Sequence, residues 1–114
     1  MKPIDSKEVY IVSSGDLRPA ANINCWPMQQ KLEGMINEAL YKLGWHAKRA
    51  HEYDPDKGHG FIDYQHIGIK VFRKIDKSKP LIVAESVWQY SHHVLAGLIT
   101  HQAPILIVAN WDGT

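Results

Sequence analysis

The chain of 114 residues has few of the features that mark several classes of protein. Its single cysteine, Cys25, cannot form an intrachain disulfide, as expected in a reducing compartment. Lys and Arg total 13 against 12 Asp and Glu, without a basic block, so nothing in the charge pattern indicates nucleic-acid binding. No apolar run is long enough to span a bilayer, and residues 1–8 lack the apolar core of a signal peptide. These absences predict a cytoplasmic protein that binds neither nucleic acid nor membrane.

Nucleotide-binding and metal-binding motifs are missing as well. The loop at residues 13–19 has one glycine and no Lys-Ser or Lys-Thr pair, which excludes a phosphate loop and a dinucleotide fingerprint. The seven histidines are dispersed, and two adjacent ones, His92 and His93, would point about 100° apart on a helix. We therefore predict no metal ligand and no catalytic residue within this chain.

Apolar runs without a polar interruption predict strands that are buried on both faces, as in a parallel sheet. These runs cover Val9–Val12, Leu81–Ala84 and Ile105–Ala109. A shorter and more polar strand is predicted at Trp45–Ala50. Its charged residues, Lys48 and Arg49, suit a sheet edge because charge discourages pairing between edges.

Helical spacing of apolar residues separates these strands. The predicted helices cover 27–43, with Pro27 in the first turn, 61–75 and 91–101. The alternation predicts an α/β fold: a three-layer α/β/α, Rossmann/flavodoxin-like domain at 1–114, whose open parallel sheet has about four strands in the order 2-1-3-4. No helix follows the fourth strand, so one flank of the sheet should lack its cover. We expect this to be the amino-terminal domain of a longer protein.

Polar and aromatic residues follow the first, third and fourth predicted strands, where ligands of open α/β sheets bind. The candidate binding residues are Asp16 and Arg18, then Glu85, Trp88 and Tyr90, and finally Trp111 and Asp112. Arginine offers a planar fork of donors, tryptophan offers a flat apolar face, and carboxylates accept bonds from hydroxyl groups, so the set suits a sugar. The alternative is a set of ordinary polar loops in which Trp88 only covers the edge of the sheet.

Three segments carry a resemblance to a known family. They are SSGDLRPAANINCWPMQQ at 13–30, IVAESVWQY at 82–90 and LIVANWDG at 106–113. Together they resemble the amino-terminal domain of the L-fucose isomerase and L-arabinose isomerase superfamily, especially its fucose isomerase-like members. The resemblance implies an aldose–ketose isomerase whose divalent metal ion, manganese, is held by later domains, and which forms a homo-oligomer, a hexamer, when full length. It also implies that Arg18 and Trp88 contact the sugar bound at a neighbouring subunit's active site.

Two functions stay open at this point. In the first, the chain is the amino-terminal domain of such an isomerase and contributes substrate contacts and subunit packing rather than metal ligands. In the second, it is a self-standing, non-catalytic sugar-binding or regulatory α/β module. The residues around the tryptophan, including Glu85, Ser86 and Gln89, depart from the family's pattern and leave the sugar undefined. The isolated chain should show no isomerase activity with added manganese.

Overall fold

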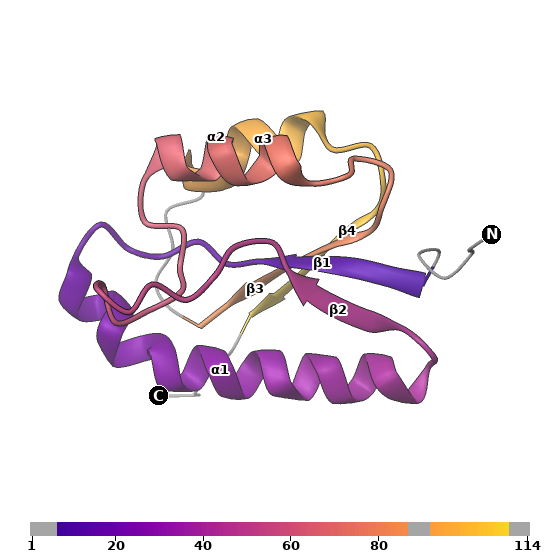
Figure 1. The fold of residues 1–114 in the computed structure, drawn as a ribbon, viewed down its shortest axis with the longest axis horizontal. Helices are drawn as coiled ribbons and strands as arrows, with labels where there is room; N and C mark the ends of the chain where they lie inside the picture. Colours follow the sequence, from indigo (N-terminus) through magenta and orange to yellow (C-terminus); the bar gives the residue numbers. More distant parts are fainter. Residues whose placement is uncertain (1–6, 87–91, 110–114) are drawn as a thin grey trace.

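The computed structural model describes residues 7–86 and 92–109, which form an α/β/α sandwich (Figure 1). Its elements are β1 (Glu8–Val12), α1 (Pro19–Lys42), β2 (His46–Arg49), α2 (Gln65–Lys74), β3 (Leu81–Glu85), α3 (His92–Thr100) and β4 (Ile105–Ala109). The strands are all parallel and lie in the order β2-β1-β3-β4. Helix α1 covers one face of this sheet, and α2 and α3 lie together on the other (Figure 1). The predicted fold class and strand order are confirmed.

Side chains that alternate between the two faces of the sheet divide the core into two clusters. The cluster toward α2 and α3 contains Val12, Ile62, Val71, Phe72, Ile75, Leu81, Val83 and Val94. The cluster toward α1 contains Val9, Ile11, Leu32, Ile82 and Ala84. Every residue of β3 is buried, as its uninterrupted apolar run predicts, because both faces of this central strand are covered.

Two glycines allow α2 and α3 to pack closely. A Cβ atom at Gly68 of α2 would lie 1.8 Å from the carbonyl oxygen of His93 on α3. A Cβ atom at Gly97 of α3 would lie 2.1 Å from Cγ of Phe72 on α2. Because neither position leaves room for a side chain, the close approach of the two helices requires glycine at both.

Helix α1 begins at Pro19 rather than at Pro27, so the predicted start was wrong. Pro19 lies in the first turn, where its missing N–H costs nothing, and Pro27 lies within the helix. An interior proline removes one helical hydrogen bond and bends the axis, and Figure 1 shows the first turns of α1 at an angle to the rest. Trp26 and Gln29 are buried beside the proline, so packing against the sheet outweighs its local preference.

Helix α2 begins at Gln65 rather than at Phe61, which is also a correction. Before the helix, the chain runs parallel to the segment that leaves β1. The Ile62 N–H donates to the Ser13 carbonyl at 2.8 Å, and the Ile62 carbonyl accepts the Gly15 N–H at 2.7 Å. These long-range bonds replace helical ones, so the apolar residues of this segment are buried by extended pairing and not by a helix.

Strand β4 is the least covered strand of the sheet. Its bounds are those predicted, but Leu106 and Ile107 are 59% and 62% exposed. Among the described residues, α1 packs on β2, β1 and β3, whereas most of β4 faces solvent. The expectation that one flank of the sheet lacks its cover is confirmed for this part of the chain.

Candidate functional site

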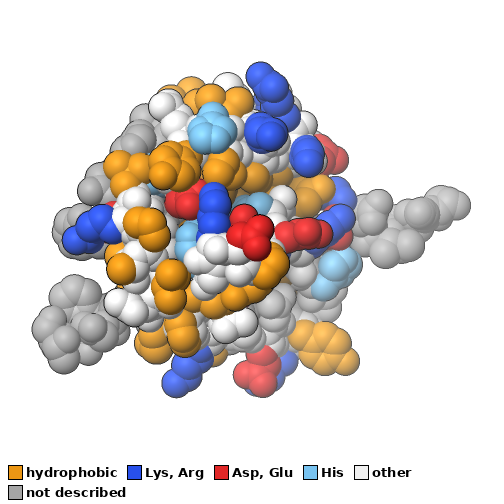
Figure 2. Space-filling view, turned by 60° about the vertical axis from the view of Figure 1, so that its left-hand side comes forward, with side chains coloured by type: hydrophobic (Ala, Val, Ile, Leu, Met, Phe, Trp, Pro, Cys, Tyr) orange, Lys and Arg blue, Asp and Glu red, His pale blue; other side chains and the backbone are white. Residues whose placement is uncertain are grey.

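The carboxyl edge between β1 and β3 is the topological switch point of this sheet. From β1 the chain crosses to α1 on one face, and from β3 it crosses to α3 on the opposite face (Figure 1). Ligands of open α/β sheets bind where two crossovers diverge in this way. Figure 2 turns the left-hand side of Figure 1, where this edge lies, toward the viewer and shows charged and histidine side chains among apolar ones on that face of the molecule. Residues 13–18 after β1, together with Glu85 and Ser86, form the candidate site.

Four consecutive backbone N–H groups tie the loop 13–16 to different parts of the molecule. In order from Ser13 to Asp16, the acceptors are His51 Nε2 at 3.2 Å, Glu85 Oε2 at 2.7 Å, Ile62 O at 2.7 Å and Asn22 Oδ1 at 2.7 Å. The chain has left the sheet here, so side chains supply three of the acceptors that a neighbouring strand would otherwise provide. The loop is thereby held in one position at the switch point.

Asp16 and Arg18, both predicted site residues, form an ion pair on this loop. Asp16 is fully buried, whereas 72% of the Arg18 side chain is exposed. Arg18 Nη2 donates to Asp16 Oδ2 at 2.6 Å, and Nε donates to Oδ1 and Oδ2 at 3.1 and 3.2 Å. Hydrogen bonding from Arg18 lowers the pKa of Asp16 to about 2. The pair fixes the orientation of a guanidinium group that solvent can still reach.

Glu85, the third predicted residue at this edge, ends β3 and is only 4% exposed. Its Oε2 accepts the Ser14 N–H, and its buried Oε1 has no hydrogen-bond partner among the described residues. Burial raises the pKa of Glu85 to about 8; the bond from Ser14 opposes this rise and the nearby Glu33 charge adds to it. At neutral pH, Glu85 is therefore mostly an uncharged acceptor for the loop.

A polar network beneath the site connects the end of β2 to the end of β3 through α1. Arg49 of β2 donates to Glu33 of α1 from Nε at 2.6 Å and from Nη2 at 3.1 Å. Gln29 Nε2 donates to Glu33 Oε2 at 2.7 Å, and the Ser86 hydroxyl donates to Gln29 Oε1 at 2.9 Å. Arg49 Nη2 also donates to the Ser13 hydroxyl at 3.0 Å. The network therefore supports the first residue of the site loop.

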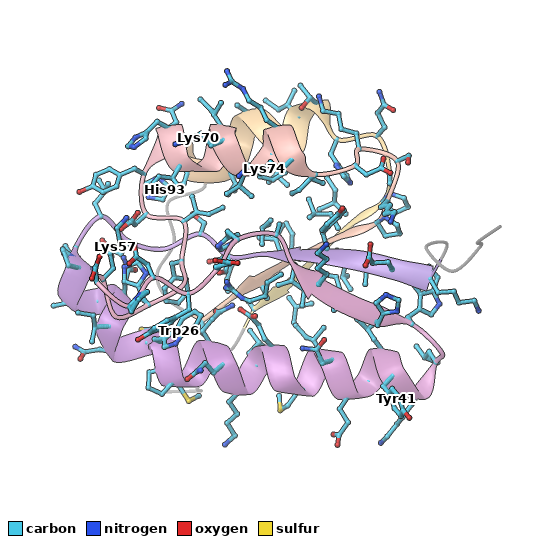
Figure 3. The ribbon with its side chains drawn as sticks, in the orientation of Figure 1. Trp26, Tyr41, Lys57, Lys70, Lys74 and His93 are labelled. Atoms are coloured by element: carbon cyan, nitrogen blue, oxygen red, sulfur yellow. The ribbon has the colours of Figure 1, made fainter. Side chains whose placement is uncertain are left out.

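The segment between β2 and α2 covers the β2 side of the site. Trp26 of α1 lies beneath this segment (Figure 3), with ring centroids 5.4 Å from Phe61 and 5.6 Å from Tyr53. The Arg49 guanidinium lies 5.2 Å from the centroid of the Trp26 ring. Burial, and then the Arg49 charge, lower the pKa of His51 to about 3, so its neutral ring can accept the loop N–H.

The structure thus brings three predicted residues, Asp16, Arg18 and Glu85, to the same edge of the sheet. The other predicted residues lie outside the described residues: Trp88, Tyr90, Trp111 and Asp112. The predicted approach of Trp88 to Arg18 therefore stays a prediction.

Sequence reasoning missed the polar network under the loop. It interpreted Arg49 as a charge that guards an edge strand, but the side chain turns inward to Glu33 and is 25% exposed. A signal for this was present, because Gln29 and Glu33 lie four residues apart on the side of α1 that also carries the buried Leu32. Polar residues in such positions indicate a buried partner from another element.

Among residues 7–86 and 92–109, no group of three or more His, Cys, Asp or Glu side chains could hold a metal ion. The resemblance assigns the manganese ion to later domains, so the metal site stays a prediction. In the same residues, no helix is long and apolar enough to cross a membrane. Comparisons with known protein families, with curated proteins and with solved structures give no match to this chain.

Proposed function

We propose that the carboxyl edge of the sheet binds a sugar, and that the chain is the amino-terminal, substrate-contacting domain of a cytoplasmic, homo-oligomeric aldose–ketose isomerase. The observation that carries this proposal is the pair of Asp16 and Arg18. Ordering a free arginine side chain costs roughly 2 kcal/mol of conformational entropy. Here a fully buried carboxylate orders the guanidinium before a ligand arrives, which is how preorganised binding sites gain affinity.

The chemistry of the pair suits hydroxyl groups rather than a strongly charged ligand. Asp16 balances the charge of Arg18, so an anion gains less at this site than beside an unpaired arginine. Neighbouring sugar hydroxyls present acceptor oxygens to a planar fork of donors. Asp16 already accepts bonds from the backbone and side chain of Arg18, so it supports the ligand contact instead of making it.

The described residues supply binding and not the chemical step. Aldose–ketose isomerisation moves a proton between adjacent carbons and needs an acid–base pair within reach of the sugar. Glu85 has a raised pKa, but neither of its carboxyl oxygens is accessible to a sugar, because Oε2 accepts the Ser14 N–H and Oε1 is buried. A self-standing sugar-binding module would make the same Arg18 contact and would lack turnover in every context.

Titration of the chain with L-fucose, L-arabinose and their ketoses, followed by calorimetry and by amide NMR, tests the proposal. We expect saturable binding, with shifts at residues 15–18, and no turnover when manganese is added. Arg18→Lys should weaken sugar binding by about tenfold. An ammonium group cannot make the planar contact with the sugar, and it cannot donate to both Asp16 oxygens in the same geometry as the guanidinium group. Arg73→Lys, on an exposed position of α2, is the matched control and should leave affinity unchanged. Equal affinities for all three proteins, or no binding of any sugar, would contradict the proposal.

A further inference from the structure

Glu85 extends the contact between β1 and β3 beyond the point where their backbones stop pairing. The register of these strands ends with Val12 opposite Val83. Strand β3 continues to Glu85, whereas the chain after β1 turns away into the loop that carries Arg18. The Glu85 carboxyl group reaches across this divergence and accepts the Ser14 N–H at 2.7 Å. A side chain thus takes the place of a ladder hydrogen bond at the switch point.

The other three acceptors of the loop hold it from other directions. His51 follows β2, Ile62 precedes α2, and Asn22 lies on α1. Among the four, only Glu85 belongs to β3. The loop that presents Arg18 is therefore fixed relative to β3 through this carboxyl group.

We propose that Glu85 is a positioning residue for Arg18: its buried carboxyl group holds the loop 13–18 against β3 and so sets the place from which Arg18 meets a ligand. The ligand contact rests on the proposed function, whereas the placement of the loop does not. Glu85 itself touches no ligand in this arrangement, because its free oxygen is buried. The role requires an acceptor of this length, and it requires no negative charge.

Two substitutions, whose side chains are nearly as long as that of glutamate, distinguish this role from simple packing. Glu85→Gln keeps an acceptor for the Ser14 N–H, whereas Glu85→Met fills the same space and cannot replace that acceptor. In the Met variant the Ser14 N–H loses the Glu85 carboxyl acceptor in a buried place, which water cannot readily compensate. Glu85→Leu serves the same purpose if the Met variant does not fold.

Amide hydrogen exchange by NMR measures the placement of the loop without any ligand. The exchange rate of the Ser14 N–H is divided by that of the Val83 N–H in the same protein, which separates a local opening at Ser14 from exchange of both amides through global unfolding. We expect the ratio to rise by about tenfold or more in the Met variant and to stay within about threefold in the Gln variant. The Arg18 Nε–H signal should shift toward that of free arginine in the Met variant alone. Unchanged ratios in the Met variant, or equal rises in both variants, would overturn the proposal.

Sugar titration of the same variants then tests the consequence for binding. We expect weaker binding by the Met variant and binding near the original strength by the Gln variant. If the unmodified chain binds no sugar, the proposed function fails, and the exchange ratios still decide the role of Glu85. If sugar binds equally to all three proteins although the Met variant has lost its Ser14 protection, Glu85 does not position Arg18.

Discussion

The two edge strands of the sheet meet solvent in opposite ways. Strand β2 exposes the polar residues His46 and Lys48 and turns Arg49 inward. Strand β4 has no charged residue, and its Leu106 and Ile107 are more than half exposed. Charge on an edge strand discourages pairing with another chain, whereas an apolar edge favours it. Strand β2 is therefore protected as an outer boundary, whereas β4 favours apolar contact.

The two ends of the strands also differ in polarity. Their carboxyl ends carry the polar site, in which the four backbone N–H groups of the loop 13–16 all have acceptors. Their amino ends border an apolar groove of about 480 Å³ on the side of α1. Its lining residues are Val9, Leu40, Leu43, Trp45, Pro80, Leu81, Ile82, Pro104, Ile105 and Leu106. Exposed apolar surface of this kind is typical of contacts between proteins, so the two ends of the sheet favour different kinds of partner.

The largest effect on stability should come from substitution of Arg49, on the inward side of β2. Arg49→Met removes the cationic partner of Glu33, which is 6% exposed, and leaves that carboxylate buried without a countercharge. We expect the free energy of unfolding to fall by roughly 3–5 kcal/mol, measured by urea denaturation. Lys48→Met, on the exposed side of the same strand, should change it by less than about 0.5 kcal/mol. Similar losses in both variants would show that β2 does not differ between its two sides.

The next largest effect on stability should come from substitution of Glu85, at the end of the central strand that pairs with β4. Its pKa is about 8 in the folded protein, against 4.5 for the same group exposed to water. Below pH 4.5 both states are protonated; from there to about pH 8 only the unfolded state loses the proton, so stability falls as pH rises. Glu85→Gln removes this pH-dependent contribution to stability. The variant should match the original protein near pH 4 and exceed it by a few kcal/mol near pH 8, since each pKa unit corresponds to about 1.4 kcal/mol.

Urea denaturation of both proteins at several pH values measures this difference directly. Asp16 also affects stability at low pH, because its lowered pKa makes it favour the ionised folded state. Both proteins contain Asp16, so its contribution cancels when their stabilities are subtracted. A difference that does not change between pH 4 and pH 8 would contradict a protonated Glu85 at neutral pH.

The smallest effect on stability should come from the exposed edge. Ile107→Lys places a charge on β4 where the side chain is 62% exposed, so the unfolding free energy should change by less than about 0.5 kcal/mol. Any concentration-dependent self-association should decrease, as measured by sedimentation velocity. Lys48→Ile makes the reciprocal change on β2 and should increase association. If the two substitutions have the same effect on association, β2 and β4 are equivalent edges in solution.

Much of the architecture follows from local pattern. Apolar runs predicted the positions of β1, β3 and β4, although β4 is mostly exposed, and their alternation with amphipathic segments predicted the parallel sheet and its order. Polar residues at the ends of these strands also predicted that Asp16, Arg18 and Glu85 lie at one edge of the sheet, where the structure places them. These features depend on hydrophobic periodicity and on the direction of parallel strands, and both can be read within a short stretch of sequence.

Other features were decided by contacts between distant segments. Pro27 lies inside a helix because its neighbours pack on the sheet, and Ile62 is extended because it bonds to Ser13 and to the chain after it. The inward turn of Arg49 depends on Glu33, 16 residues earlier in the chain. The protonation of Glu85 depends on burial by the whole fold. Sequence by itself determined which segments form the sheet and where polar groups gather, whereas burial and hydrogen bonding across the sequence decided what those groups do.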